Sequence, residues 1–353
     1  MSTPAAVADA ALGAPPPPGR AVIWNEPFDA ALLVAPLMAG LTCAAIAAAD
    51  ARMYPVVLLG DLWFLGYHHV VATYTRLAFN VESLRRNRFF AVDLLLLVTG
   101  AAVGVALTAG VWVIVSLFLY FQWFHYMRQG YGIARMYFRS TPRGLVAGTR
   151  DLTADLVIYL VPIYGIAQRS ATMGDRFLGL PVKAIVLPDV LVTALGTAAA
   201  VATAAWAIRA GRAATRGELD SRYTAFVASH VGIFLAAYVF TDDVNVGWLA
   251  INVWHNLQYV LVVWMVNGKR YAGGIDPKAR LLSTISQPGR TAAYFGSCLA
   301  VSTVIYLALG QVTSAVVGGG VAAVLGVYMG INFHHYVVDA MIWKRRRVAA
   351  PAV

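Results

Sequence analysis

The hydrophobic residues of this chain come in blocks of about twenty, and this pattern constrains its fold more than any other feature. A helix rises ~1.5 Å per residue, so a block of about twenty residues crosses the ~30 Å hydrocarbon layer of a bilayer. The composition agrees, because 59% of the 353 residues are hydrophobic and only 12% are charged, against roughly 25% in ordinary soluble domains. The sequence therefore predicts an all-α, polytopic transmembrane bundle.

We expect one transmembrane domain over 30–343, with about ten helices and no internal repeat. Residues 1–29, rich in Ala and Pro, predict a disordered cytoplasmic arm, and they lack the clean apolar stretch of a signal peptide. Residues 344–353 predict a basic cytoplasmic tail. The ten predicted spans are 30–49, 55–80, 89–108, 111–138, 152–170, 184–208, 222–241, 245–267, 291–309 and 314–343.

The basic residues test this topology independently. If both termini are cytoplasmic, 22 of the 27 Lys and Arg residues fall on the cytoplasmic side, as the positive-inside rule requires. The exceptions are Arg52, Arg169, Arg176 and Lys183 outside, and Arg128 within a span. We expect an integral protein of the bacterial inner membrane. The net charge of +10 is then mainly a topology signal beside anionic lipid, and no nucleic-acid partner is expected.

All seven histidines lie inside predicted spans, although ionisable side chains in hydrocarbon are costly and usually functional. Counted from the cytoplasmic end of each span, every histidine lies about eight to thirteen residues deep, or roughly 12–20 Å. Imidazoles from five helices thus reach one level. The two cysteines, Cys43 and Cys298, both lie in apolar runs, so a disulfide framework or a cysteine zinc site is not expected.

Polar residues flank these histidines at helical spacing. Positions three before and four after a histidine share its helical face, and such neighbours can orient a metal-binding imidazole. The flanking residues are Gln122 and Gln129 around His125, Asn252 and Tyr259 around His255, and Asn332 and Asp339 around His335. In the second span, Asp61 precedes His68 by seven residues and Thr73 follows His69 by four. Asp155 is a further candidate buried carboxylate.

The histidine layer predicts a metal or haem site, because neutral imidazole suits iron, copper and zinc. The candidate ligands are His68, His69, His125, His255, His334 and His335. Adjacent helical residues point about 100° apart, so we expect four or five direct ligands. Tyr259 and Asp339 are the candidate catalytic residues, while Gln122, Gln129, Asn252, Asn332 and Asp61 would position the site. His230 has only Ser229 and Thr224 nearby and predicts a helix-packing role.

Four histidine-bearing segments, YHHVVATYTR, FHYMRQGYG, WHNLQYV and FHHYVVDAMIW, resemble in type the histidine-rich integral-membrane iron enzymes. That class contains lipid desaturases, hydroxylases and carotenoid-cleaving oxygenases. The chain lacks their HxxxH and HxxHH boxes and has fewer histidines than their di-iron centres use, so no family residue is transferred. The resemblance implies non-haem iron, mononuclear or dinuclear, with copper, zinc and haem as alternatives.

We therefore expect a metal-dependent membrane oxidoreductase of the oxygenase, hydroxylase or desaturase type, acting on a hydrophobic or lipid-like substrate from the bilayer. An acidic electron donor such as a ferredoxin would dock on the basic face. Three alternatives stay open: a haem-binding membrane electron carrier, a membrane-bound O-acyltransferase with one buried histidine such as His255, and a proton-coupled transporter.

Overall fold

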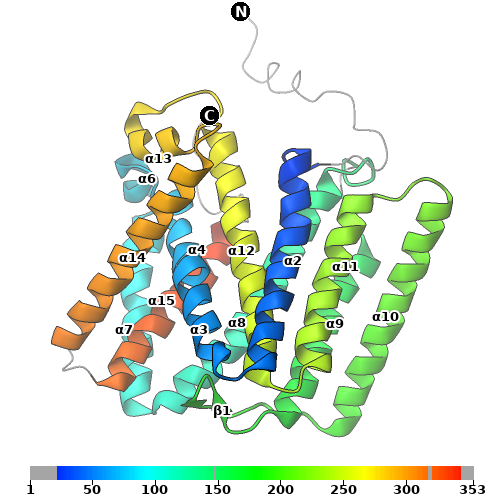
Figure 1. The fold of residues 1–353 in the computed structure, drawn as a ribbon, viewed down its shortest axis with the longest axis horizontal. Helices are drawn as coiled ribbons and strands as arrows, with labels where there is room; N and C mark the ends of the chain where they lie inside the picture. The colour runs from blue at the N-terminus through cyan, green and yellow to red at the C-terminus, as the bar shows by residue number, and fades with distance from the viewer. Residues whose placement is uncertain (1–21, 147, 317–319, 343–353) are drawn as a thin grey trace, which may run out of the picture.

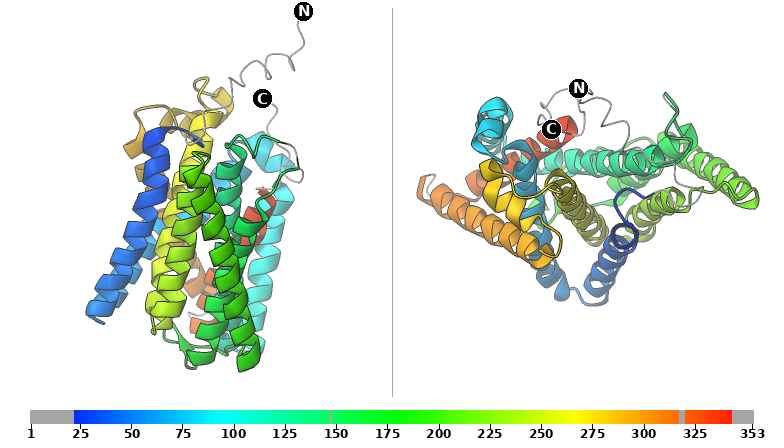
Figure 2. Two further views of the ribbon diagram at one scale, coloured as in Figure 1. Left: turned by 90° about the vertical axis from the view of Figure 1, so that its right-hand side faces the viewer. Right: turned by 90° about the horizontal axis from the view of Figure 1, so that it is seen from above.

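The long helices of the protein run side by side in a bundle, with α14 at one end and α10 at the other (Figures 1 and 2). The computed structural model describes residues 22–146, 148–316 and 320–342. Within these ranges only β1 (Arg176–Phe177) and β2 (Leu180–Pro181) are strands, paired antiparallel in a small hairpin. The prediction of an all-helical bundle is confirmed. Residues 1–21 of the predicted arm and the predicted tail at 344–353 lie outside the described residues.

The helical elements follow one another with short connections. In chain order they are α2 (Glu26–Ala49), α3 (Met53–Asp61), η1 (Leu62–Gly66), α4 (Tyr67–Ala72), α5 (Tyr74–Leu77), α6 (Val81–Arg86), η2 (Phe89–Asp93), α7 (Leu94–Thr108), α8 (Val111–Arg139), α9 (Leu152–Thr172), α10 (Asp189–Thr215), α11 (Ser221–Leu235), η3 (Ala236–Phe240), α12 (Val244–Arg270), η4 (Pro277–Ala279), α13 (Arg280–Ile285), α14 (Thr291–Val316) and α15 (Val321–Ile342).

Eight helical segments of the described chain are long and apolar enough to cross a membrane. They coincide with eight of the ten predicted spans, so the protein is a membrane protein by the length and composition of its helices. The other two predicted spans, 111–138 and 152–170, correspond to the long helices α8 and α9. The first helix starts at Glu26, four residues before the predicted span, because the Asn25 side chain accepts the Phe28 N–H and caps it.

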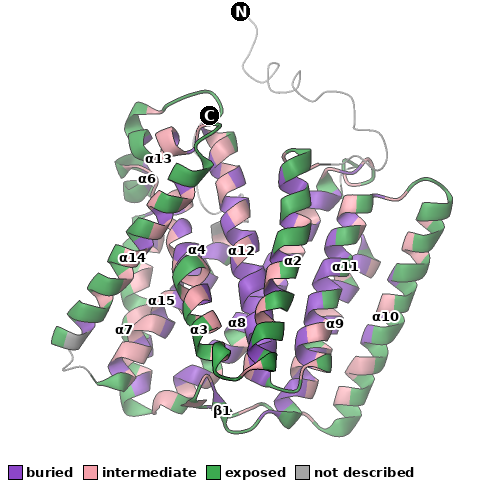
Figure 3. Ribbon diagram, in the orientation of Figure 1, coloured by how far each residue is buried: buried purple, intermediate pink, exposed green. Residues whose placement is uncertain are grey.

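Helix α12 is the centre of the bundle. In its most apolar stretch 78% of the residues are buried, against 11% in α10 and 17% in α14, and Figure 3 shows the same contrast. A helix surrounded by other helices can carry polar side chains that lipid would not tolerate. This explains why Asn252, His255, Asn256, Gln258 and Tyr259 all occur on α12, and all are buried.

Two glycines bring α15 close to α7. A Cβ at Gly326 would lie 2.7 Å from the Cα of Val103, and a Cβ at Gly330 would lie 2.6 Å from the Cα of Thr99. Both distances are too short for any other residue, so this small-residue spacing sets the approach of the two helices. The contact fixes the position of α15, and His335 lies on this helix a little more than one turn after Gly330.

The second span contains a π-helical turn, η1, directly before α4. Its last bond runs from the Tyr67 N–H to the Leu62 carbonyl, five residues back. A π turn takes up about one residue more than an α turn and often occurs at functional sites. Residues after η1 are therefore shifted in helical phase by about one position. Asp61 consequently shares the side facing α12 with His69, whereas the sequence spacing predicted His68.

A buried ion pair outside the predicted spans yields a pH prediction. Asp151 caps α9 through the Ala154 N–H and pairs with Arg209 and Arg143. Burial raises the pKa of the Asp151 carboxyl, but the Arg209 and Ala154 hydrogen bonds outweigh burial and hold the pKa below its usual 3.8. A depressed folded-state pKa stabilises the protein above the unfolded value, and this contribution disappears as the pH falls through the folded value.

We expect wild-type protein to be more stable than Asp151→Asn in urea or thermal unfolding at pH 7, with the difference shrinking once the pH falls below about 4. Arg209→Gln should reduce the pH dependence in the same way, because it removes the main stabilising partner of the carboxylate. A difference between wild type and Asp151→Asn that is the same at pH 3 and pH 7 would contradict this assignment.

Candidate metal centre

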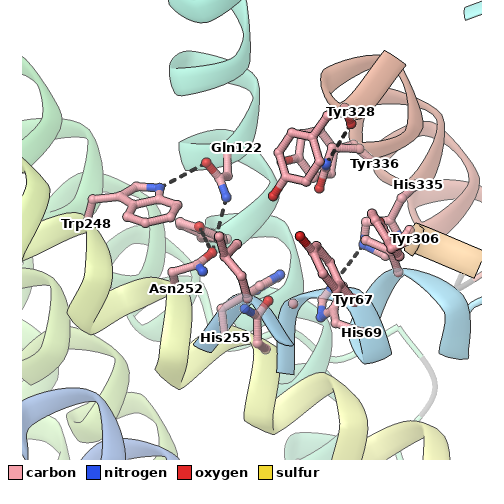
Figure 4. A pocket seen from close by; sticks show the side chains of 16 residues that line it. Tyr67, His69, Gln122, Trp248, Asn252, His255, Tyr306, Tyr328, His335 and Tyr336 are labelled. Carbon is pink, nitrogen blue, oxygen red and sulfur yellow. Dashed lines mark hydrogen bonds between the residues drawn. The ribbon is translucent and has the colours of Figure 1, made fainter. Parts of the chain in front are cut away.

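Three of the predicted ligands converge inside the bundle. His69 of α4, His125 of α8 and His335 of α15 are each at most 4% exposed. The Nε2 atom of His335 lies 2.6 Å from Nε2 of His69 and 3.3 Å from Nε2 of His125. One ring nitrogen from each histidine lies within 4.8 Å of the other two. Three separate helices thus bring imidazole nitrogens to one point, with His69 and His335 visible in Figure 4.

The His335 ring is oriented by groups from two other helical elements. Its Nδ1 atom lies 2.8 Å from Oγ1 of Thr73, and Thr73 lies 2.9 Å from the hydroxyl of Tyr259. The Tyr259 hydroxyl interacts in turn with Asp339. When Nδ1 donates its proton to Thr73, the Nε2 lone pair is left facing His69 and His125. Outer hydrogen bonds of this kind fix the tautomer of metal-binding histidines.

His255 of α12 lies against the three histidines as a fourth imidazole. Its ring centroid is 4.7 Å from that of His69 and 4.8 Å from that of His125. Its Nδ1 atom is buried and has no hydrogen-bond partner among the described residues. A buried nitrogen without a partner costs free energy, so His255 is the fourth candidate ligand.

The donor set suits a metal ion. For metal–nitrogen bonds of about 2.0–2.1 Å, neighbouring nitrogens lie about 2.8–3.4 Å apart in tetrahedral or octahedral sites. The His335–His125 separation of 3.3 Å falls in this range, the His335–His69 separation of 2.6 Å is slightly shorter, and the whole group lies within 4.8 Å. Burial also suits metal binding, because it disfavours the charged imidazolium form and a neutral imidazole has a free nitrogen lone pair. Within the described chain the group consists of the three histidines and includes no carboxylate.

A small cavity lies beside the histidines. It offers about 20 Å³ to a water-sized sphere, roughly enough for one small molecule such as water. Its wall combines imidazoles, amides and phenols. The labelled side chains in Figure 4 belong to this wall: Tyr67, His69, Gln122, Trp248, Asn252, His255, Tyr306, Tyr328, His335 and Tyr336.

On the other side of the cavity, the side chains of α12 hold a buried carboxylate. Asp61 accepts hydrogen bonds from the Asn252 and Asn256 amides. Asn252 accepts in turn from the Tyr126 hydroxyl at 2.5 Å and from the Gln122 amide at 3.2 Å. Every member lies in or beside the cavity wall. The network fixes α3, α8 and α12 relative to each other around the histidines.

Two predicted ligands do not join the cluster. His68 lies against Phe295 of α14, at 5.8 Å between ring centroids. The Nε2 atom of His334 is bonded to the Phe90 carbonyl at 2.6 Å. In each His-His pair one ring therefore reaches the centre and the other lies against a neighbouring helix. His230 bonds the Ile158 carbonyl at 3.0 Å, which is a helix-packing contact as the sequence predicted.

The predicted polar neighbours are near the site. Gln122 and Gln129 bond to α12, whereas Asn332 bonds within its own helix, α15. Gln122 accepts from the Trp248 indole, Gln129 donates to the His255 carbonyl, and Asn332 donates to the Tyr328 carbonyl. None of these three orients the histidine of its own helix. Asp155 is only half-buried, and it interacts electrostatically with Arg135.

Sequence reasoning missed Asn256 and Tyr306 as wall residues. Asn256 follows Asn252 by four residues, so its place on the same face was readable from the spacing. Tyr306 lies in the predicted span 291–309, which contains no histidine, so no feature of the sequence linked it to the histidine layer. Comparison with known proteins gives no match, whether against family models, curated proteins or solved structures.

Proposed function

We propose that this protein is an integral-membrane, metal-dependent oxidoreductase that acts on a hydrophobic substrate. The observation that carries the proposal is the convergence of His69, His125 and His335 from three helices, with His255 beside them. The cluster is buried in a helical bundle whose outer surface is apolar. Such a site excludes bulk water and admits substrates from the lipid phase.

In this proposal the ligands hold a single iron ion, which would supply redox chemistry with molecular oxygen when bound. The chain itself supplies four further contributions. Thr73 and Tyr259 hold the His335 ring, the Asp61 network keeps the opposite wall in place, and the tyrosines of the cavity exclude water. Tyr259 and Asp339 form the hydrogen-bonded route by which a proton would reach or leave the His335 side of the site.

The geometry favours an ion over a haem. The Nε2 atoms of His69 and His335 are 2.6 Å apart, whereas axial ligands on the two faces of a haem iron need a nitrogen separation of about 4 Å, twice a ~2 Å bond. A cavity of about 20 Å³ is far smaller than a macrocycle.

The number of membrane spans and the side of the membrane on which the termini lie belong to the same proposal. We propose that α8 and α9 also cross the membrane, which gives ten spans and places both termini in the cytoplasm. Helices of 29 and 21 residues are long enough to span, and the basic loops favour this orientation. The basic cytoplasmic face would then receive an acidic electron donor in a bacterial inner membrane. Alkaline-phosphatase fusions to the loops should be active only where the loop is external.

Metal analysis of the detergent-purified protein, together with its absorption spectrum, tests the proposal. We expect about one iron per chain and no Soret band. A Soret band would replace the proposal with a haem electron carrier. Protein that is folded and binds none of iron, copper or zinc would refute it, and would favour the acyltransferase and transporter alternatives.

A further inference from the structure

A second, much larger hollow lies next to the candidate metal centre. It is a partly open apolar groove of about 800 Å³ between α4, α5, α7, α14 and α15, with α13 at one end. Small-molecule sites measure about 300–1,000 Å³, so the groove is large enough for a substrate. Its lining includes Val71, Leu96, Cys298, Ile305, Leu309 and Ile331. Along α14 it extends from Ser297 to Leu309, or about 18 Å at helical rise.

One layer of side chains separates the groove from the small cavity at the histidines. Val70 and Tyr306 line both hollows. The Tyr306 ring stacks on Tyr67 with 3.8 Å between ring centroids and 11° between planes, and its buried hydroxyl has no hydrogen-bond partner among the described residues. The groove therefore borders the cavity at the histidines through the side chains of Val70 and Tyr306.

Positive charge lies at the α13 end of the groove. Lys278 and Arg280 both line it there. Lys278 is paired with Glu82 of α6 at 3.2 Å, so its charge is largely offset. Arg280 is exposed and forms no ion pair in the described part of the chain. A guanidinium at the end of an apolar groove is complementary to a carboxylate head on a hydrocarbon tail.

We propose that this groove binds a long-chain fatty carboxylate, with the head at Arg280 and the chain along α14. The proposal rests on the proposed function by naming its substrate class, although binding itself requires no metal. Tyr306 lies nine residues, or about 14 Å, along α14 from Ser297. The part of the chain that faces the histidines is therefore a mid-chain methylene rather than the head.

Equilibrium binding of radiolabelled palmitate to the full-length protein in detergent tests the proposal. Ile305→Trp fills the groove and should weaken palmitate binding at least about tenfold, equivalent to 1.4 kcal/mol. Leu307→Trp is the matched control, because Leu307 is on the same helix, is 66% exposed and does not line the groove. Its palmitate affinity should stay within twofold of wild type.

Arg280→Gln tests the head-group contact without disturbing packing, because Arg280 is exposed. It should weaken palmitate binding several-fold and leave binding of hexadecanol, the neutral probe of equal length, unchanged. Palmitate uptake that does not saturate, or that Ile305→Trp and Leu307→Trp reduce equally, would overturn the proposal and leave the groove to bilayer lipid. If Arg280→Gln weakened the binding of palmitate and of hexadecanol equally, the placement of the carboxylate at Arg280 would be overturned.

The proposed metal-dependent function and the proposed fatty-carboxylate site can be refuted independently of each other. Palmitate binding should persist in His335→Ala, since that residue lies outside the groove lining. Wild-type protein that binds palmitate in the predicted pattern but holds no metal would refute the proposed function and leave this site intact. Protein that binds iron but no palmitate would refute the fatty-carboxylate site and leave the proposed function intact.

Discussion

Replacing His335 with alanine is expected to lower the metal content of the purified protein at least about tenfold. The Nε2 atom of His335 lies between those of His69 and His125, so its loss removes the central member of the group. Substitutions that only disturb the outer bonds of a metal-binding histidine already cost about 10–100-fold in affinity. Thr73→Val, which removes the Nδ1 partner, should therefore lower metal affinity within that range.

His334→Gln is the control for this loss, because it changes the next residue in the chain. The His334 ring bonds the Phe90 carbonyl, and a glutamine amide can donate the same bond. His230→Gln is a second control on α11. Both variants should retain the metal content of the wild type when measured by elemental analysis under the same purification. Equal metal content in His335→Ala and His334→Gln would show that the ligands are assigned incorrectly.

Asp61→Ala should destabilise the folded protein by about 2–4 kcal/mol. The carboxylate accepts the Asn252 and Asn256 amides inside the bundle, and a buried donor without a partner costs about 1–3 kcal/mol. The destabilisation should appear in thermal or denaturant unfolding in detergent, followed by tryptophan fluorescence. Because Asn252 lines the cavity, the variant should also bind metal more weakly even at temperatures where it is folded.

Asp50→Ala is the matched control for this loss of stability. Asp50 lies in the loop after α2, and its side chain pairs with the exposed Arg52. Removal of a surface pair costs little, so the unfolding midpoint should stay close to wild type. Asp61→Asn keeps one acceptor oxygen and should give an intermediate loss. If Asp61→Ala unfolds at the same midpoint as Asp50→Ala, the network contributes nothing to holding α3, α8 and α12 together.

The helices and the level of the site were predictable because both depend on local rules. Apolar blocks of membrane length specify where helices run, and the cost of a polar group in lipid specifies that the histidines face inward. From equal depth the sequence predicted one histidine layer, and His69, His125, His255 and His335 of that layer lie together in the bundle. The start of α2 was missed by four residues, since its Asn25 cap lies upstream of the apolar run.

The partners of each polar side chain were not predictable in the same way. Spacing along one helix assigned Gln122, Asn252 and Asn332 to the histidines beside them, but none of the three bonds its histidine. Gln122 and Asn252 bond each other and groups of neighbouring helices, and Asn332 bonds a carbonyl of its own helix. The bonds of Gln122 and Asn252 depend on which groups the adjacent helices present, and that depends on helix rotation and crossing. Periodicity within one helix carries no information on either.

The sequence by itself determined that this chain forms membrane-length helices, because helix length and apolarity act residue by residue. It also predicted that the imidazoles lie at one depth. Tertiary structure alone decided which imidazoles meet. The η1 turn shifts the phase so that His69 rather than His68 faces α12, and the Gly326 and Gly330 contacts with α7 set the position of His335. A site made by four helices depends on their relative rotation, and only packing between them fixes that.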